Sequence, residues 1–265
     1  MYYVISGVNG NLKAFLTFIS WIDSFDKDAV YIHLGDFIGE DNGWEFMNWA
    51  QENITPTGKY QAVLSRDIQM VLDACNPSKK NEIAIYSAKQ NYGLFYLQAM
   101  VPKDRKELIG FMESLPVCKE ITCTDKAYYV VESWLDEYDL YLMKHGIHSG
   151  INKHELRMRC LYAGMNNDNK IDLQGVLIRN NRHKCIGVFG NVIHLPANQG
   201  IQCFCLEKDN FLVGRYHEEI KILWQEVKIL WLNAFCCFTN HNRDSITYFC
   251  MVYKNSLQQF LLLLQ

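Results

Sequence analysis

Several side chains that could bind a cation lie in loops that follow short β-prone segments. They are Asn9, Asp36, Asp67, Glu132 and Asn191. Carboxylate and amide oxygens are the ligands that hard cations such as Mg²⁺ and Mn²⁺ prefer. Arg66 directly precedes Asp67, and a guanidinium among carboxylates could instead replace a metal's charge and hold the loops together by salt bridges. The residue types alone leave both possibilities open.

The elements that must position these side chains form three strand, loop and helix units near the N-terminus. Apolar segments typical of buried strands lie at 2–6, 29–34 and 61–64, and helical patterns follow them at 12–19, 44–50 and 68–72. This succession predicts an α/β fold with a mainly parallel sheet. Ligands of such sheets bind at the carboxyl ends of the strands, where Asn9, Asp36 and Arg66 lie.

The second half of the chain has a different pattern, in which a helical segment is followed by several strand-like segments. Residues 76–116 are charged and helical in pattern, and they predict a helical insert over the sheet. Strand-like segments then follow at 118–122, 127–132, 185–190 and 201–206. We therefore expect further β-rich layers from this half.

The composition argues against several classes of protein. Of the 265 residues, 49% are hydrophobic, which is enough for one large core and a small appendage. The 26 basic and 29 acidic residues give a formal net charge of −3, so we expect no nucleic-acid partner. The ten cysteines are scattered without a Cys-x-x-Cys pair, and the first residues do not resemble a secretory leader. These features predict reduced thiols and a cytoplasmic location.

Residues 216–265 form an apolar tail. A direct repeat at 218–231 has a period of seven residues over only two units. Its apolar residues recur at helical spacing and predict a helix that docks on the core, on a partner or on a second copy of the chain. These residues are Ile220, Leu223, Trp224, Val227, Leu230 and Trp231. Polar residues interrupt the later apolar segments, so we expect no membrane span.

Three of the N-terminal loops carry motif-like sequences. Residues 4–12 read Val-Ile-Ser-Gly-Val-Asn-Gly-Asn-Leu, residues 33–40 read His-Leu-Gly-Asp-Phe-Ile-Gly-Glu, and residues 63–67 read Val-Leu-Ser-Arg-Asp. In this order they resemble the Asp-x-His-Gly-Asn, Gly-Asp-x-x-Asp-Arg and Gly-Asn-His motifs of calcineurin-like metallophosphoesterases, of the protein serine/threonine phosphatase type. Each motif alone is weak, and motifs in the family's order are more specific.

Later segments resemble the rest of the family's pattern, so that the resemblance runs from residue 2 to about residue 215. A Phe-x-x-Ser-Leu-Pro segment within 108–120 resembles the stretch before the fourth motif. Residues 130–133 then lie where the fourth motif has Val-His-Ala, and residues 188–192 lie where the fifth has Gly-His-Thr. A second register would place His148 in the fourth motif and restore one ligand. We prefer Glu132, because the strand before it and its distance from the Phe-x-x-Ser-Leu-Pro segment match better.

The resemblance implies both a fold and a site. The implied fold is a four-layer αββα sandwich over residues 1–215, with two β-sheets packed face to face and helices outside. The implied site is a pair of divalent metals that share a bridging carboxylate and activate a hydroxide for attack on phosphorus. Of the residues that build this centre, only the bridging carboxylate, Asp36, is retained.

The remaining family positions carry residues of different chemistry. Five metal-ligand positions fall, in chain order, on Gly7, Asn9, Arg66, Glu132 and Asn191. The catalytic His, its supporting Asp and the phosphate-binding Arg fall on Asp67, Gly39 and Glu40. A carboxylate at position 40 would repel a phosphate group that an arginine binds through two hydrogen bonds.

This pattern favours a degenerate phosphatase-like domain, a pseudoenzyme that acts as a binding or regulatory module without a cofactor. Its partner would be another protein or a small phosphate-like ligand. The alternative is an active phosphoesterase for phosphoproteins or nucleotide phosphates. It would hold Mn²⁺ or Mg²⁺ in an oxygen-rich centre around Asp36, with Asn9, Glu132, Asn191 and His148 as further candidate ligands.

Overall fold

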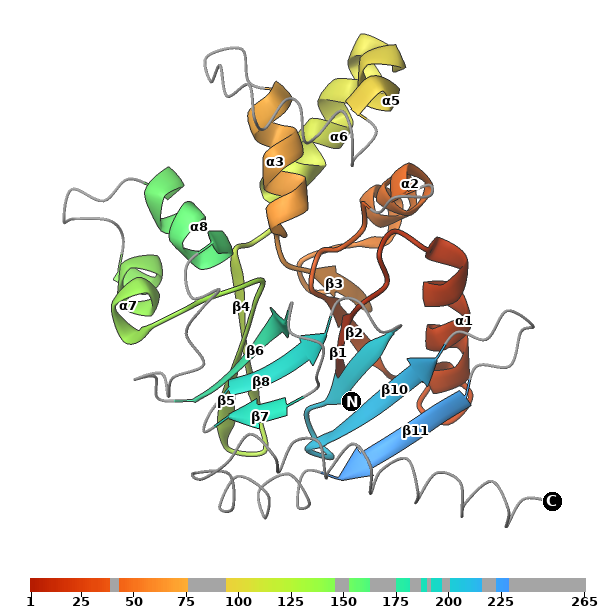
Figure 1. The fold of residues 1–265 in the computed structure, drawn as a ribbon, viewed down its shortest axis with the longest axis vertical. Helices are drawn as coiled ribbons and strands as arrows, with labels where there is room; N and C mark the ends of the chain where they lie inside the picture. The colour runs from red at the N-terminus through yellow and green to blue at the C-terminus, as the bar shows by residue number, and fades with distance from the viewer. Residues whose placement is uncertain are drawn as a thin grey trace, which may run out of the picture. The chain divides into compact units, whose positions relative to one another are not determined.

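The computed structural model describes residues 1–38, 43–75, 94–145, 153–162, 175–181, 187–189, 192–196, 201–215 and 223–228. Contacts between Cα atoms group Met1–Lys228 into one compact unit. Within this unit the described residues form two β-sheets and several helices (Figure 1).

Three strand, loop and helix units build one half of the first sheet, as the sequence predicts. Strands β1 (Tyr2–Ser6), β2 (Val30–His33) and β3 (Tyr60–Ala62) pair in parallel. Helices α1 (Leu12–Asp23), α2 (Gly43–Asn53) and α3 (Arg66–Cys75) follow them in turn. Asn11 begins α1, because its side-chain oxygen accepts a hydrogen bond from the Ala14 N–H at 2.9 Å. All three strands end at the same edge of the sheet.

The other half of this sheet comes from the C-terminal part of the chain. Strands β9 (Gln202–Cys205), β10 (Asn210–Arg215) and β11 (Leu223–Lys228) add antiparallel partners, in the order β11-β10-β9-β1-β2-β3. The helix expected from the spacing in 218–231 is wrong for residues 223–228. Every residue of β11 pairs with β10, whose outer edge would otherwise expose unpaired backbone groups, and this pairing outweighs a short helical pattern.

The second sheet has the order β4-β5-β6-β8-β7. Its strands are β4 (Cys118–Cys123), β5 (Lys126–Val131), β6 (Val176–Asn181), β7 (Gly187–Phe189) and β8 (Val192–Pro196). The three central strands are parallel to one another, and β4 and β7 pair antiparallel at the edges. Helices α7 (Glu137–His145) and α8 (Lys153–Tyr162) lie between β5 and β6 in the chain. Helices α5 (Leu94–Ala99) and α6 (Pro102–Ser114) belong to the expected insert, whose first part, 76–93, lies outside the described residues.

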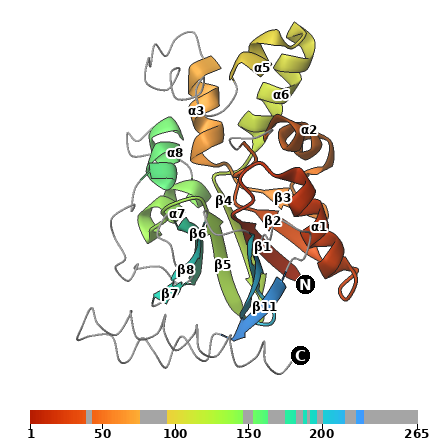
Figure 2. The same ribbon diagram turned by 45° about the vertical axis from the view of Figure 1, so that its right-hand side comes forward.

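The two sheets lie face to face, with α1 and α2 outside one sheet and α7 and α8 outside the other (Figures 1 and 2). Alternate residues of a strand face opposite sides of its sheet. Tyr3 of β1 belongs to one buried cluster with Phe15 of α1, and Tyr129 of β5 belongs to another with Leu142 of α7. Tyr128 faces the other way. Its hydroxyl donates a hydrogen bond to the Leu206 carbonyl oxygen, just after β9 in the first sheet, at 3.4 Å. The expected α/β sandwich of four layers is confirmed.

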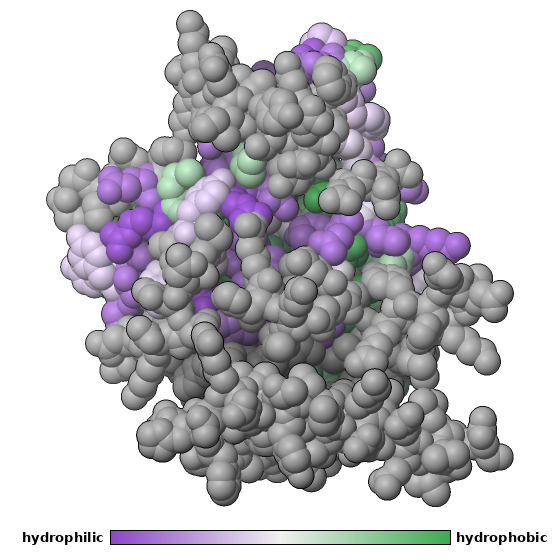
Figure 3. Space-filling model, viewed as in Figure 1, coloured by the Kyte–Doolittle hydropathy of each residue, from purple (hydrophilic) through white to green (hydrophobic). Residues whose placement is uncertain are grey.

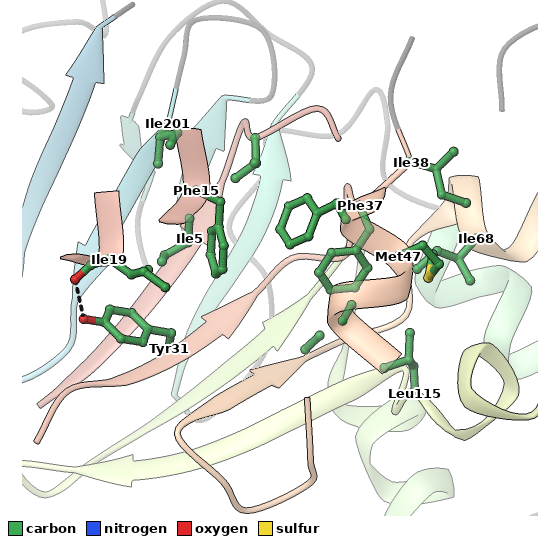
Figure 4. Packing of buried hydrophobic residues seen from close by; sticks show 14 of the residues in the cluster. Ile5, Phe15, Ile19, Tyr31, Phe37, Ile38, Met47, Ile68, Leu115 and Ile201 are labelled. Atoms are coloured by element: carbon green, nitrogen blue, oxygen red, sulfur yellow. Dashed lines mark hydrogen bonds between the residues drawn. The ribbon is translucent and has the colours of Figure 1, made fainter. Parts of the chain in front are cut away.

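Burial of apolar side chains between these layers holds the sandwich together. On the face seen in Figure 3, the described surface is mostly hydrophilic from the side of α7 and α8 across towards α1. Inside, Phe15 of α1 lies beside Ile5 of β1, and Met47 of α2 lies beside Ile68 of α3, within one buried cluster (Figure 4). Fully burying a side chain of this size contributes about 1.5–3 kcal/mol. None of the helices in the described ranges is long and apolar enough to cross a bilayer.

Candidate functional site

The carboxyl ends of β1, β2, β3 and β5 bring the polar loops together. Asp36 and Asp67 both raise the pKa of Glu132, and Arg66 lowers it. These four side chains therefore interact electrostatically, although they lie far apart in the sequence. Asp36, Arg66 and Asp67 follow neighbouring parallel strands of the first sheet, which present their carboxyl ends at one edge. Glu132 follows β5 of the second sheet, so the cluster joins the two sheets.

Asp36 is bound by the backbone of the loop that follows β1. Its Oδ2 atom accepts hydrogen bonds from the N–H groups of Val8 at 3.0 Å and Asn9 at 3.3 Å. The Asp36 carbonyl oxygen accepts a third bond, from the Gly10 N–H, at 3.1 Å. The side chain is only 7% exposed. Asp36 therefore joins the loop after β2, in which it lies, to the loop after β1.

Positive φ angles, which glycine and asparagine adopt more easily than other residues, let the loops approach each other. Gly7 has φ 76°, and Asn9 has φ 48°, in a region that asparagine tolerates better than most residues. Gly35 has φ 89°, and a Cβ atom there would lie 2.5 Å from the carbonyl oxygen of Val63. Only glycine fits at position 35, so β2 can end close against the segment that follows β3.

His33, to which we assign no role from the sequence, lies beside the second carboxylate oxygen of Asp36. Its Nδ1 atom accepts the Gly35 N–H at 2.9 Å, so the ring proton lies on Nε2, 3.4 Å from Asp36 Oδ1. Burial lowers the pKa of His33 to about 4, against an opposite effect of Asp36. The imidazole is therefore neutral at pH 7. It stacks on Phe37 with ring centroids 4.4 Å apart, which fixes its orientation.

Arg66 and Asp67 lie at the start of α3 as an adjacent pair. Arg66 Nη2 lies 3.2 Å from Asp67 Oδ1, and the two side chains are 16% and 22% exposed. Ser65 helps to begin the helix, because its Oγ atom accepts the Ile68 N–H at 3.3 Å. Arg66 also acts on Tyr162 at the end of α8. Burial raises the pKa of Tyr162 to about 12, and Arg66 opposes this rise. The Arg66 guanidinium thus places a positive charge near the Asp67 and Glu132 carboxyl groups and the Tyr162 phenol.

Glu132 and Asn180 form a pair that the sequence pattern does not reveal. Val131 pairs with Arg179 across β5 and β6, so the residues that follow them lie level with each other. Asn180 Nδ2 lies 3.4 Å from both carboxylate oxygens of Glu132. Burial, followed by Asp67 and Asp36, raises the pKa of Glu132 to about 8. The carboxyl group is therefore mostly protonated at neutral pH.

Four predicted site residues, Gly39, Glu40, His148 and Asn191, lie outside the described residues. Glu132 lies level with the end of β6. Among the described residues, Asn180 is the polar side chain that β6 places beside Glu132. The sequence analysis predicts no strand at β6, although the apolar run at 176–178 is a signal that indicates one.

The donors in the described loops do not fit a pair of divalent metals. Asp36 Oδ2 is already engaged by two N–H groups, and both carboxylate oxygens of Glu132 lie 3.4 Å from the Asn180 amide nitrogen. Arg66 places a fixed positive charge beside Asp67. No three His, Cys, Asp or Glu side chains among the described residues are arranged to hold a metal ion. Two bridged metals need several converging anionic or imidazole ligands, and these loops instead bind one another.

No protein-family model matches the chain, and no curated protein matches it either. Among solved structures, the chain is similar to a candidate diadenosine tetraphosphatase, with 9% identity over 85% of this chain and 92% of that chain and a TM-score of 0.47. It is also similar to an archaeal phosphodiesterase, with 10% identity over 85% and 98% of the two chains and a TM-score of 0.35. A candidate 5′-nucleotidase from Staphylococcus aureus shares 10% identity over 86% of this chain and 53% of that chain, with a TM-score of 0.34. All three TM-scores lie below 0.5.

Proposed function

We propose that this chain is a degenerate member of the calcineurin-like metallophosphoesterases, of the protein serine/threonine phosphatase type, that acts as a binding or regulatory module. The observation that carries the proposal is the state of Asp36. Its carboxylate accepts hydrogen bonds from Val8 and Asn9, residues of the loop in which the family places its first metal ligands. We interpret these bonds as the exchange of a catalytic role for a structural one.

The order of the motifs supports membership of the family. The resemblance in the sequence requires that the loops after β1, β2, β3 and β5 meet. Glu132 does interact with Asp36, Arg66 and Asp67, although nearly a hundred residues separate Asp36 from it. A two-sheet sandwich with parallel central strands provides this meeting point. The family assignment therefore rests on the motifs of this chain and on the positions of its loops.

Arg66 supports the idea that a charge-neutralising cluster replaces the metals. The guanidinium lies beside Asp67 and lowers the pKa of Glu132, which are the effects that a cation between these carboxylates would have. It is 16% exposed, so a phosphate-like group or a carboxylate of a partner protein could still reach it. The ligand we propose is thus a small anion or an acidic segment of a protein. Self-association through 218–231 stays a separate prediction, with a strand rather than a helix in 223–228.

Turnover of p-nitrophenyl phosphate in added Mn²⁺ tests the proposal. We expect the wild-type protein and the Asp36→Asn variant to show the same rate, at the level of buffer with Mn²⁺. Asparagine keeps an oxygen that can accept the loop N–H groups, so the variant should remain folded. Turnover by the wild-type protein that Asp36→Asn abolishes would reject the pseudoenzyme. It would favour the alternative, an active phosphoesterase with an oxygen-rich Mn²⁺ or Mg²⁺ centre.

A further inference from the structure

A cavity of about 410 Å³ lies on the helix side of the first sheet, away from the polar loops. Its lining comes from β1, β9, β10, the C-terminal end of α1 and the turn between β9 and β10. The lining residues are Tyr3, Trp21, Phe25, Cys205, Lys208, Asn210 and Leu212. Tyr3 pairs with Cys205, and Cys205 pairs with Asn210, so these three form one row across the sheet. Tyr3 precedes Gly7 by about 13 Å of extended strand, so the cavity is separate from the candidate site.

The walls of the cavity are mainly aromatic. Trp21 and Phe25 meet edge to face with ring centroids 4.9 Å apart. Phe25 is 49% exposed, which is unusual for a phenylalanine and places its ring at the rim. The Tyr3 hydroxyl already donates to Asp26 Oδ2 at 3.1 Å, so Tyr3 offers its ring rather than a free donor. Burial raises the pKa of Cys205, and the thiol is a neutral, apolar part of the wall.

The polar part of the lining is small and carries a positive charge. Lys208 Nζ lies 5.8 Å from the centre of the Phe25 ring, at the same rim. Asn210 adds a side-chain amide and is only 5% exposed. None of the seven lining residues in the described part of the chain is a carboxylate. A ligand that complements this lining has a flat apolar body and one negative charge near Lys208.

We propose that this cavity binds a small aromatic carboxylate. Its volume lies in the range of pockets that enclose small ligands, about 300–1,000 Å³, and accommodates one or two fused rings. The rings contact Trp21, Phe25 and Leu212, and the carboxylate pairs with the Lys208 ammonium. The proposal is independent of the chemistry at Asp36.

The test compares 2-naphthoate with its neutral counterpart 2-naphthamide, by calorimetry and by ligand-observed NMR on the full chain. Lys208→Gln is expected to weaken naphthoate binding about fivefold, because it removes one partly exposed charge pair. The same variant should change naphthamide binding less than twofold. Lys103→Gln, at an exposed lysine on α6, is the matched control and should change neither.

A second variant tests the aromatic wall. Phe25→Ala removes a half-exposed ring that contributes little to the core, and it should weaken both ligands by about tenfold. Tyr141→Ala, at another exposed aromatic residue, should leave both affinities unchanged. The proposal is wrong if naphthoate does not bind at millimolar concentration. It is also wrong if Phe25→Ala leaves binding intact, or if Lys208→Gln weakens both ligands equally.

Discussion

Replacing Asp36 by alanine is expected to lower the free energy of unfolding by about 3 kcal/mol, because it leaves two buried N–H groups without an acceptor. Those groups belong to Val8 and Asn9, and both bonds end on the same carboxylate oxygen. The neutral His33 ring beside the other oxygen would also lose its polar neighbour. Urea denaturation, followed by circular dichroism in the presence of EDTA, measures the change. EDTA matters here because a loss of stability without metal can only come from the protein's own contacts.

The matched control for this experiment is Asp67→Ala. Asp67 is also an aspartate of the polar cluster, but it is 22% exposed and forms an ion pair with the adjacent Arg66. A partly exposed ion pair of this kind contributes at most about 1 kcal/mol. Equal losses in the two variants, or an Asp36→Ala protein as stable as the wild type, would contradict a structural role for Asp36.

Glu132→Gln is expected to flatten the dependence of stability on pH between about 4.5 and 8. In the wild-type protein, burial and the nearby Asp67 and Asp36 raise the pKa of Glu132 from 4.5 to about 8. Above pH 4.5 the unfolded chain releases this proton and the folded chain keeps it. Stability from this group is therefore complete below pH 4.5 and is lost as the pH rises to 8, by up to about 5 kcal/mol. Glutamine can still accept from Asn180 and does not titrate.

Unfolding free energies at pH 5 and pH 8, for both proteins, measure this effect. Between pH 5 and pH 8, the unfolding free energy of the wild-type protein should fall by at least about 3 kcal/mol more than that of Glu132→Gln. Glu107→Gln, at a half-exposed glutamate on α6, is the control and should follow the wild type. Parallel pH profiles of the wild type and Glu132→Gln would show that Glu132 is ionised in the folded protein.

Local patterns in the sequence predict the N-terminal units of the fold, but they do not predict β6, β8 or β10. The three N-terminal strands and their helices are predictable because each unit combines an apolar run, a loop and a helical repeat. Strand β11 is not predictable in this way. Residues 223–228 carry a spacing that suits a helix, and only the free edge of β10 gives the reason for a strand. Pairing between distant segments is information that a local pattern lacks.

The candidate site is predictable in its position but not in its contacts. The sequence places Asp36, Arg66, Asp67 and Glu132 at strand ends, and the described structure brings them into one electrostatic cluster. The sequence does not indicate that Asp36 binds the loop after β1, because this contact depends on the direction in which two backbone N–H groups point. Asn180 is also missed, since its role beside Glu132 follows from the pairing of β5 with β6.

The measurement that tests the central claim most directly is the metal content of the purified protein, by elemental analysis before and after dialysis against Mn²⁺. A cluster in which Arg66 supplies the positive charge predicts well below one metal ion per chain after dialysis, with the same value for Asp36→Asn. Two metal ions per chain in the wild-type protein, lost in Asp36→Asn, would contradict the account and show that the loops rearrange into a metal centre.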